Sequence, residues 1–165
     1  MCDYYCMKQY TEKQIEETRE YFEKNKYRLV SENVGNRTIQ YYVLPSKLCE
    51  ELPNFVFRMT GDSDKGLFGI SEDVHEKVRK YAVGHEVIEF MEIGINAKDR
   101  CVQALEKELE LVPLDARKNY IQMRKNFFAN LIPYCEKHPE DYTPEDIKEF
   151  GQSWARLNDL VEELK

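Results

Sequence analysis

The feature that most limits the fold is an apolar segment that carries three titratable side chains. The segment runs from Tyr81 to Met91 and contains His85, Glu86 and Glu89 among Val, Ile, Ala and Phe. At about 100° per residue, its apolar side chains fall on nearly all sides of a helix, so we expect a helix packed on several faces. A buried carboxylate beside a buried imidazole must find charged or hydrogen-bonding partners, because an isolated ionised group in a core is strongly destabilising.

The spacing of these polar residues is typical of a metal site. His85 and Glu89 are four residues apart and stack on one helical face, which is how zinc-binding helices present two ligands to one ion. Glu86 lies about 100° around the helix from His85, a position that suits a general base. In such sites the ion lowers the pKa of its bound water to about 7, and the neighbouring carboxylate takes the proton during attack on a carbonyl. The segment therefore predicts a metal-dependent hydrolase that uses zinc.

The remaining pattern predicts one α+β domain covering residues 1–165. A chain of this size can bury a substantial core without a second domain. Periodicity and turn residues predict a small, mostly antiparallel sheet of three to four strands, preceded by one helix and followed by several. The expected helices are 12–26, 71–91, 97–111, 115–135 and 143–164, and the expected strands are 27–32, 38–44, 54–60 and 67–70, with a polar loop at 61–66.

Charge and cysteine usage exclude several classes of protein. The net charge of -7, with no run of basic residues, disfavours nucleic acid and anionic membranes as partners. No apolar run approaches the roughly 20 residues that span a bilayer. The cysteines are odd in number and form no C-x-x-C pair, which indicates reduced thiols and a cytoplasmic location. They are Cys2, Cys6, Cys49, Cys101 and Cys135.

The stretch from Ala82 to Met91 resembles the extended helix motif of the zincin metallopeptidases, in which uncharged residues surround H-E-x-x-H. Glu89 stands where that motif has its second histidine, and a carboxylate is a harder, more negative zinc ligand. The resemblance implies a minimal zincin-like fold, a peptide or protein as substrate, and a short edge strand at 66–70 that leads into the helix of the site.

The resemblance also implies a third metal ligand from the following helix. Gluzincin-like enzymes take a glutamate there, and Glu108 has the best spacing among Glu106, Glu108 and Glu110. Glu92 and Asp99 remain alternatives, because Glu92 shares the face of His85 and Asp99 opens the next helix.

Two other interpretations stay open. The chain can be a zincin-like scaffold that has lost catalysis and acts as a binding or regulatory protein, or its buried acids and His85 can hold the helix without a metal. His75 is expected at the surface near the start of its helix, and His138 at a helix C-terminus. The apolar stripe around Trp154 predicts packing of the last helix and is also compatible with a homodimer face.

Overall fold

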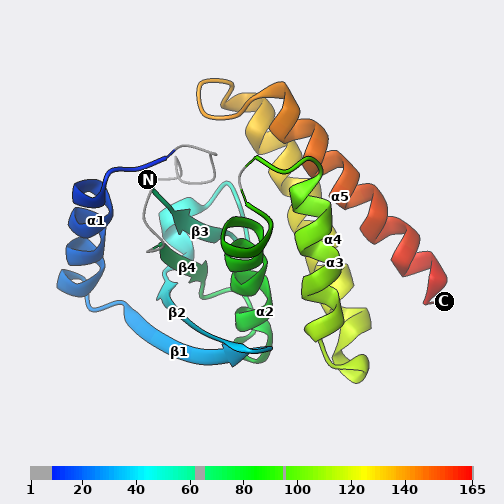
Figure 1. Cartoon of the computed structure of the whole chain (residues 1–165), viewed down its shortest axis with the longest axis horizontal. Coiled ribbons are helices and arrows are strands. Elements are labelled where there is room, and N and C mark those ends of the chain that lie inside the picture. The colour runs from blue at the N-terminus through cyan, green and yellow to red at the C-terminus, as the bar shows by residue number, and fades with distance from the viewer. Residues whose placement is uncertain (1–8, 62–65, 95, 165) are drawn as a thin grey trace. The chain divides into compact units, whose positions relative to one another are not determined.

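The computed structural model describes residues 9–61, 66–94 and 96–164 (Figure 1). Within these residues it contains five α-helices and a four-stranded sheet, which confirms the α+β class. The chain divides into two compact units, Met1–Val83 and Gly84–Lys165, and each is described by itself. Helix α2 (Glu76–Val87) begins in the first unit and ends in the second.

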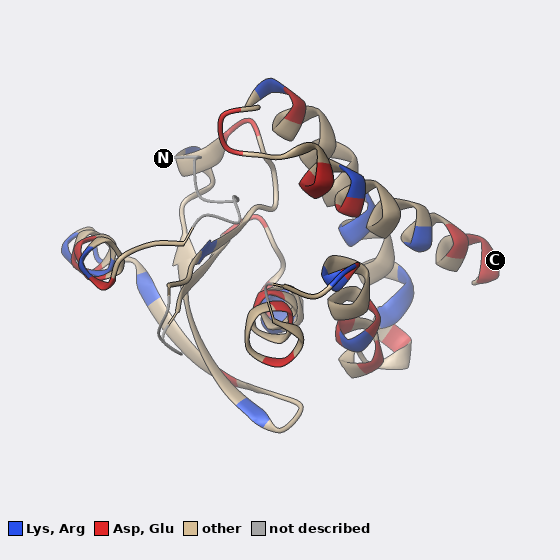
Figure 2. Ribbon diagram, turned by 45° about the horizontal axis from the view of Figure 1, so that its top comes forward, with Lys and Arg blue, Asp and Glu red and all other residues tan. Residues whose placement is uncertain are grey.

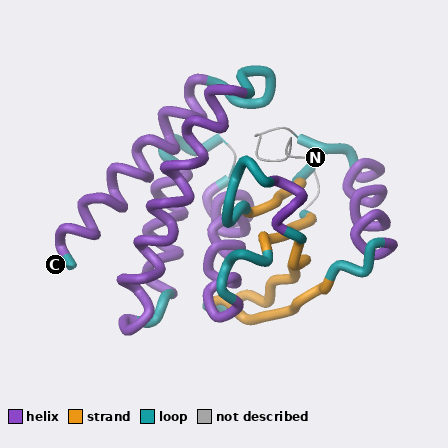
Figure 3. The backbone as a smooth tube through the Cα atoms, turned by 180° about the vertical axis from the view of Figure 1, so that it is seen from behind, coloured by secondary structure: helices purple, strands orange, loops and turns teal. Residues whose placement is uncertain are grey.

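The first unit contains the sheet, whose strand order is β1-β2-β4-β3 (orange in Figure 3). Two pairings are antiparallel and only β2 with β4 is parallel, so the sheet is mostly antiparallel as expected. The expectation of an edge strand at 66–70 is wrong, because β4 lies between β2 and β3 and is buried along its whole length, as inner strands are. The strands are β1 (Arg28–Val34), β2 (Arg37–Leu44), β3 (Val56–Met59) and β4 (Leu67–Ser71).

Helix α1 (Glu12–Lys24) covers part of this sheet with a single apolar side. Thr11 and Gln14 form a capping box, in which the Thr11 hydroxyl accepts from the Gln14 N–H and the Gln14 side chain accepts from the Thr11 N–H. The buried ring of Phe22 lies edge-on to Tyr42 and Phe57, each 5.2 Å away between centroids. The helix expected at 12–26 is therefore present, with a capped start and one buried side.

The boundaries of the next two helices differ from the prediction. The helix expected from residue 71, α2, starts only at Glu76. The Ser71 backbone N–H donates to the Phe55 carbonyl, and the Ser71 hydroxyl accepts from the Asp73 N–H in a turn. Ser71 and Asp73 form a turn and not a helix cap, because the hydrogen bonds of the strand extend through Ser71. Similarly, the helix expected from residue 97 begins at Arg100.

The second unit is helical and its helices follow one another through short connections. Helix α5 contacts both α3 and α4, and α3 contacts η2 (Figures 1 and 3). The α5 stripe packs only in part as expected, because Phe150 and Leu157 are buried whereas Trp154 keeps 36% of its surface exposed. The elements are the π-helix η2 (Ile88–Ile93), α3 (Arg100–Leu111), α4 (Leu114–Lys137) and α5 (Pro144–Glu163).

Acidic and basic residues are interspersed along the helices, as Figure 2 shows by colour. Among the described residues, no helix combines the length and apolar character needed to cross a membrane.

The cysteines depart from the expectation of five reduced thiols. Cys49 is disulfide-bonded, so that expectation is wrong for this residue. Cys101 and Cys135 are buried thiols. Cys2 and Cys6 lie outside the described residues, as do residues 62–65 of the expected polar loop.

Candidate metal centre

The centre begins where an α-helix changes into a π-helix. His85 lies near the end of α2, and Glu89 lies in η2. The Gly94 N–H closes the π-type bond to the Glu89 carbonyl at 2.9 Å, and its φ of 88° is readily adopted only by glycine. Short π-helical segments are rare and often mark functional sites. Residues 82–89 are buried, so the prediction of a helix packed on several faces is confirmed.

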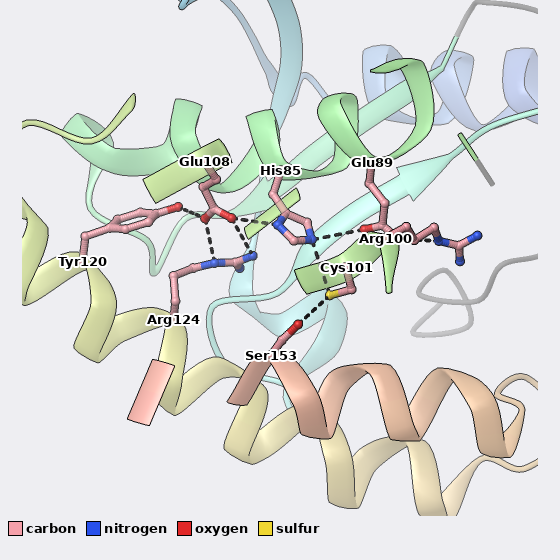
Figure 4. Close-up of polar contacts among 8 residues, drawn as sticks. All are labelled: His85, Glu89, Arg100, Cys101, Glu108, Tyr120, Arg124 and Ser153. Atoms are coloured by element: carbon pink, nitrogen blue, oxygen red, sulfur yellow. Dashed lines mark hydrogen bonds and ion pairs between the residues drawn. The ribbon is translucent and has the colours of Figure 1, made fainter. Parts of the chain in front are cut away.

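The two imidazole nitrogens of His85 face different carboxylates (Figure 4). Nε2 lies 3.1 Å from Glu89 Oε2, and Nδ1 lies 2.7 Å from Glu108 Oε2. Glu89 and Glu108 therefore lie on opposite sides of the ring. Because one ion binds only one nitrogen of a given imidazole, His85, Glu89 and Glu108 do not surround one ion position in this arrangement. The structure brings the three predicted ligands together but divides them between two roles.

Glu108 is held from a second helix, α4. The Tyr120 hydroxyl donates a hydrogen bond to Glu108 Oε1, and Arg124 Nε lies 2.9 Å from the same oxygen. Arg124 Nη2 also donates to Oε2 at 3.5 Å. Glu108, Tyr120 and Arg124 are each at most 2% exposed. A buried carboxylate needs such partners, and Oε2 of Glu108 is shared between Arg124 and His85.

Glu89 has its own cationic partner. Arg100 Nε donates to Glu89 Oε1 at 2.8 Å, which leaves Oε2 beside His85 Nε2. The Arg100 guanidinium also lies 5.4 Å from the Phe90 ring centroid, a favourable cation–π distance. Arg100 is the first residue of α3, and it is 2% exposed.

A thiol and a hydroxyl complete the group around Nε2. Cys101 Sγ lies 3.7 Å from His85 Nε2, and the Ser153 hydroxyl on α5 donates to this sulfur at 3.1 Å. One donor atom from each of His85, Glu89 and Cys101 lies within 4.8 Å of the other two. These are the nitrogen, oxygen and sulfur ligands that zinc accepts.

The protonation states follow from burial and from the neighbouring charges. Burial lowers the pKa of His85, but the Glu108 charge and hydrogen bonds to Cys101, Glu108 and Glu89 outweigh it and raise this pKa well above its ordinary value of 6.5. Burial raises the pKa of the Cys101 thiol despite the opposing effect of His85. These shifts favour an imidazolium at His85 and a thiol at Cys101 in the metal-free protein.

The other sequence candidates fall outside this group. Glu92 is exposed and pairs with Lys107 at 3.5 Å, and Asp99 is exposed with a left-handed φ of 51°.

His75 is exposed just before α2 and His138 is the residue that ends α4, so both expectations are confirmed. Glu86, the candidate general base, is 3% exposed and follows His85 directly in α2.

Four residues of this group were not predicted from the sequence, namely Arg100, Tyr120, Arg124 and Ser153, and Cys101 was predicted only as a reduced thiol. One signal was available in the helical spacing. Cys101 and Glu108 are seven residues apart, so two turns of α3 bring both side chains to one face. A cysteine and a glutamate on one face of the helix after the His85 segment would have pointed to both neighbours of the imidazole.

Comparisons with family models, with curated proteins and with solved structures found no match. The functional interpretation therefore rests on the geometry of the group itself.

Proposed function

We propose that this protein is a metal-dependent hydrolase of the peptidase type, with zinc held by His85 and Glu89. One observation carries the proposal: Glu108 occupies Nδ1 of His85 at 2.7 Å, while Nε2 lies 3.1 Å from Glu89 Oε2. Carboxylates that hold the non-coordinating nitrogen of a histidine are characteristic of metal sites, where they fix the tautomer and the ring orientation.

The distances fit a zinc ion. Zinc binds imidazole nitrogen and carboxylate oxygen at about 2.0–2.1 Å, so two ligands of a tetrahedral centre are about 3.3 Å apart. The observed separation of 3.1 Å between Nε2 and Oε2 is close to this value. It is also longer than the roughly 2.7–2.9 Å of a charge-assisted hydrogen bond, the range in which the Nδ1 contact to Glu108 falls.

The residues of the chain have separate roles in this proposal. When bound, a divalent ion supplies Lewis acidity and lowers the pKa of a coordinated water to about 7. Glu86 is the proposed general base, since it adjoins His85 in the sequence without sharing its helical direction. Glu108 orients the ring of His85 through Nδ1. Arg100 donates a hydrogen bond to one oxygen of Glu89, while the other oxygen faces Nε2 of His85.

The catalytic proposal is tested with a mixture of fluorogenic peptides and the zinc-loaded protein. We expect turnover by the native chain, loss of turnover with retained zinc in Glu86→Gln, and loss of both in His85→Gln. Glu92→Gln is the matched control, because Glu92 is an exposed neighbour of the same segment. Unchanged turnover in Glu86→Gln would rule out this base, and zinc binding without any turnover would leave a metal-binding protein without hydrolytic activity.

The ion pairs of Arg100 and Arg124 favour a second candidate function, that of a binding or regulatory protein without a metal. Arg100 pairs with Glu89 and Arg124 pairs with Glu108, so both carboxylates already have cations, and an imidazolium at His85 bridges them. A binding or regulatory protein needs only this network to hold its helices together. In that case His85→Ala lowers the melting temperature, whereas chelators leave the melting temperature of the native chain unchanged.

A cytoplasmic location also remains a proposal, based on the odd and scattered cysteines. The disulfide at Cys49 counts against it, because disulfides are rare in reducing compartments. Alkylation of thiols in intact cells, followed by mass spectrometry of the chain, decides the matter. A freely alkylated Cys49 supports the cytoplasm, and a protected Cys49 that reacts only after reduction contradicts it.

A further inference from the structure

We propose that Cys101 is the third protein ligand, which makes the centre an imidazole–carboxylate–thiolate site for zinc or cobalt. This inference rests on the proposed function only in requiring that an ion binds beside His85 and Glu89. It replaces Glu108, the ligand expected from the sequence, with a residue from the start of the same helix.

The position of the sulfur fits a shared ion. With zinc–nitrogen and zinc–sulfur bonds of about 2.0 and 2.3 Å, nitrogen and sulfur ligands of a tetrahedral centre are about 3.5 Å apart. Cys101 Sγ lies 3.7 Å from His85 Nε2, the nitrogen that Glu89 also faces. All three donor atoms lie within 4.8 Å of one another and come from α2, η2 and α3. Glu108 instead holds the opposite nitrogen.

Ser153 is placed to support the sulfur as a ligand. Its hydroxyl donates to Cys101 Sγ at 3.1 Å, and both side chains are at most 1% exposed. A hydrogen bond donated to sulfur stabilises the thiolate form that binds a metal. The centre therefore has outer partners on all three ligands: Glu108 for His85, Arg100 for Glu89 and Ser153 for Cys101 (Figure 4).

The donor set defines the kind of ion. Thiolate is a soft ligand that favours zinc and similar transition metals, whereas magnesium and calcium prefer sites made entirely of oxygen atoms. The set of one nitrogen, one oxygen and one sulfur atom therefore discriminates against magnesium and calcium. With three protein ligands, a tetrahedral ion keeps one position for water or substrate, as catalytic zinc sites do.

Cobalt(II) is the probe, because its spectrum distinguishes an ion bound through the Cys101 thiolate from an ion bound without it. We titrate the native chain with cobalt(II) and record both the visible ligand-field bands and the near-ultraviolet band from thiolate-to-cobalt charge transfer. We expect both signals, loss of the charge-transfer band in Cys101→Ser, and retention of both in Cys135→Ser. Cys135 is the matched control because it is also a buried thiol of the second unit.

The outcomes distinguish this inference from the proposed function. Ligand-field bands without charge transfer would show an ion bound without Cys101, which overturns the inference and leaves the proposed function standing. Absence of every cobalt and zinc signal would overturn both. If Cys101→Ser does not fold, X-ray absorption of the native zinc-loaded chain serves instead: one sulfur neighbour at about 2.3 Å supports the inference, and a shell of only nitrogen and oxygen contradicts it.

Discussion

Glu108 Oε2 lies 2.7 Å from Nδ1 of His85, and this contact decides which side of the imidazole is available. The contact fixes the ring so that Nε2 faces Glu89 and Cys101. Glu108, expected from the sequence to bind a metal, therefore orients the imidazole of His85 instead. The interactions of Glu108 lead to predictions about the stability of the fold. The donor atoms of Glu89 and Cys101 beside Nε2 lead to predictions about binding of the proposed ion.

Removing the Glu108 carboxylate should destabilise the fold strongly. Arg124 would be left as a buried cation, and His85 would lose its Nδ1 partner, which together should cost about 3–5 kcal/mol in Glu108→Ala. The control Glu110→Ala changes an exposed glutamate of the same helix and should stay within about 0.5 kcal/mol. Urea unfolding measures both, and similar losses in the two variants would refute the role given to Glu108.

The stability of the metal-free protein should fall as the pH rises. The pKa of folded His85 is raised above 6.5 by Glu108 and by its hydrogen bonds, which outweigh burial. Its stabilising contribution is therefore complete below pH 6.5 and is lost as the pH increases through the raised value. Urea unfolding in chelator across this range should show the decline in the native chain and a flatter profile in His85→Gln. Parallel profiles would contradict an imidazolium in the folded state.

Zinc binding should release protons. The raised pKa values favour a protonated His85 and a thiol at Cys101 in the metal-free protein, and both groups must lose a proton to bind an ion. At about pH 7 we expect about two protons per zinc for the native chain and about one for Cys101→Ser, measured in weakly buffered solution with a pH indicator. Release of about one proton by both proteins would show that Cys101 stays protonated.

The helix that carries Ser153 depends on its N-cap. The Thr143 hydroxyl accepts from the Asp146 N–H at 3.2 Å, and Asp146 accepts from the Thr143 N–H at 2.8 Å. Thr143→Ala should cost about 1 kcal/mol, whereas Thr143→Ser keeps the hydroxyl and most of the stability. Thermal unfolding compares the variants, and equal losses in both would show that the hydroxyl does not stabilise this helix.

The sequence predicted most of the fold because its signals are local. Thr11 and Thr143 mark helix starts through capping boxes, and Pro113 falls between α3 and α4. The start of α2 was missed because Ser71 has the same chemistry in a cap and in a turn, and only the pairing of β4 decides between them. The inner position of β4 depends on which strands pair, which periodicity does not reveal.

The site was predictable in part for the same reason. His85 and Glu89 are close in sequence, so helical spacing alone placed them together. The side of the ring on which Glu108 lies depends on the packing of α3, and the roles of Tyr120 and Arg124 depend on α4 as well. Helical spacing predicted which residues lie near His85, but not the side from which each one approaches the imidazole.

The central claim is that one ion binds at His85 and Glu89, and the zinc content of the purified chain tests it most directly. The native chain and Glu92→Gln are loaded with zinc, dialysed against metal-free buffer and analysed by plasma mass spectrometry beside His85→Gln and Glu89→Gln. We predict about one zinc per chain in the first pair and almost none in the second pair. Equal zinc content in all four proteins, or no retained zinc in the native chain, would contradict the claim.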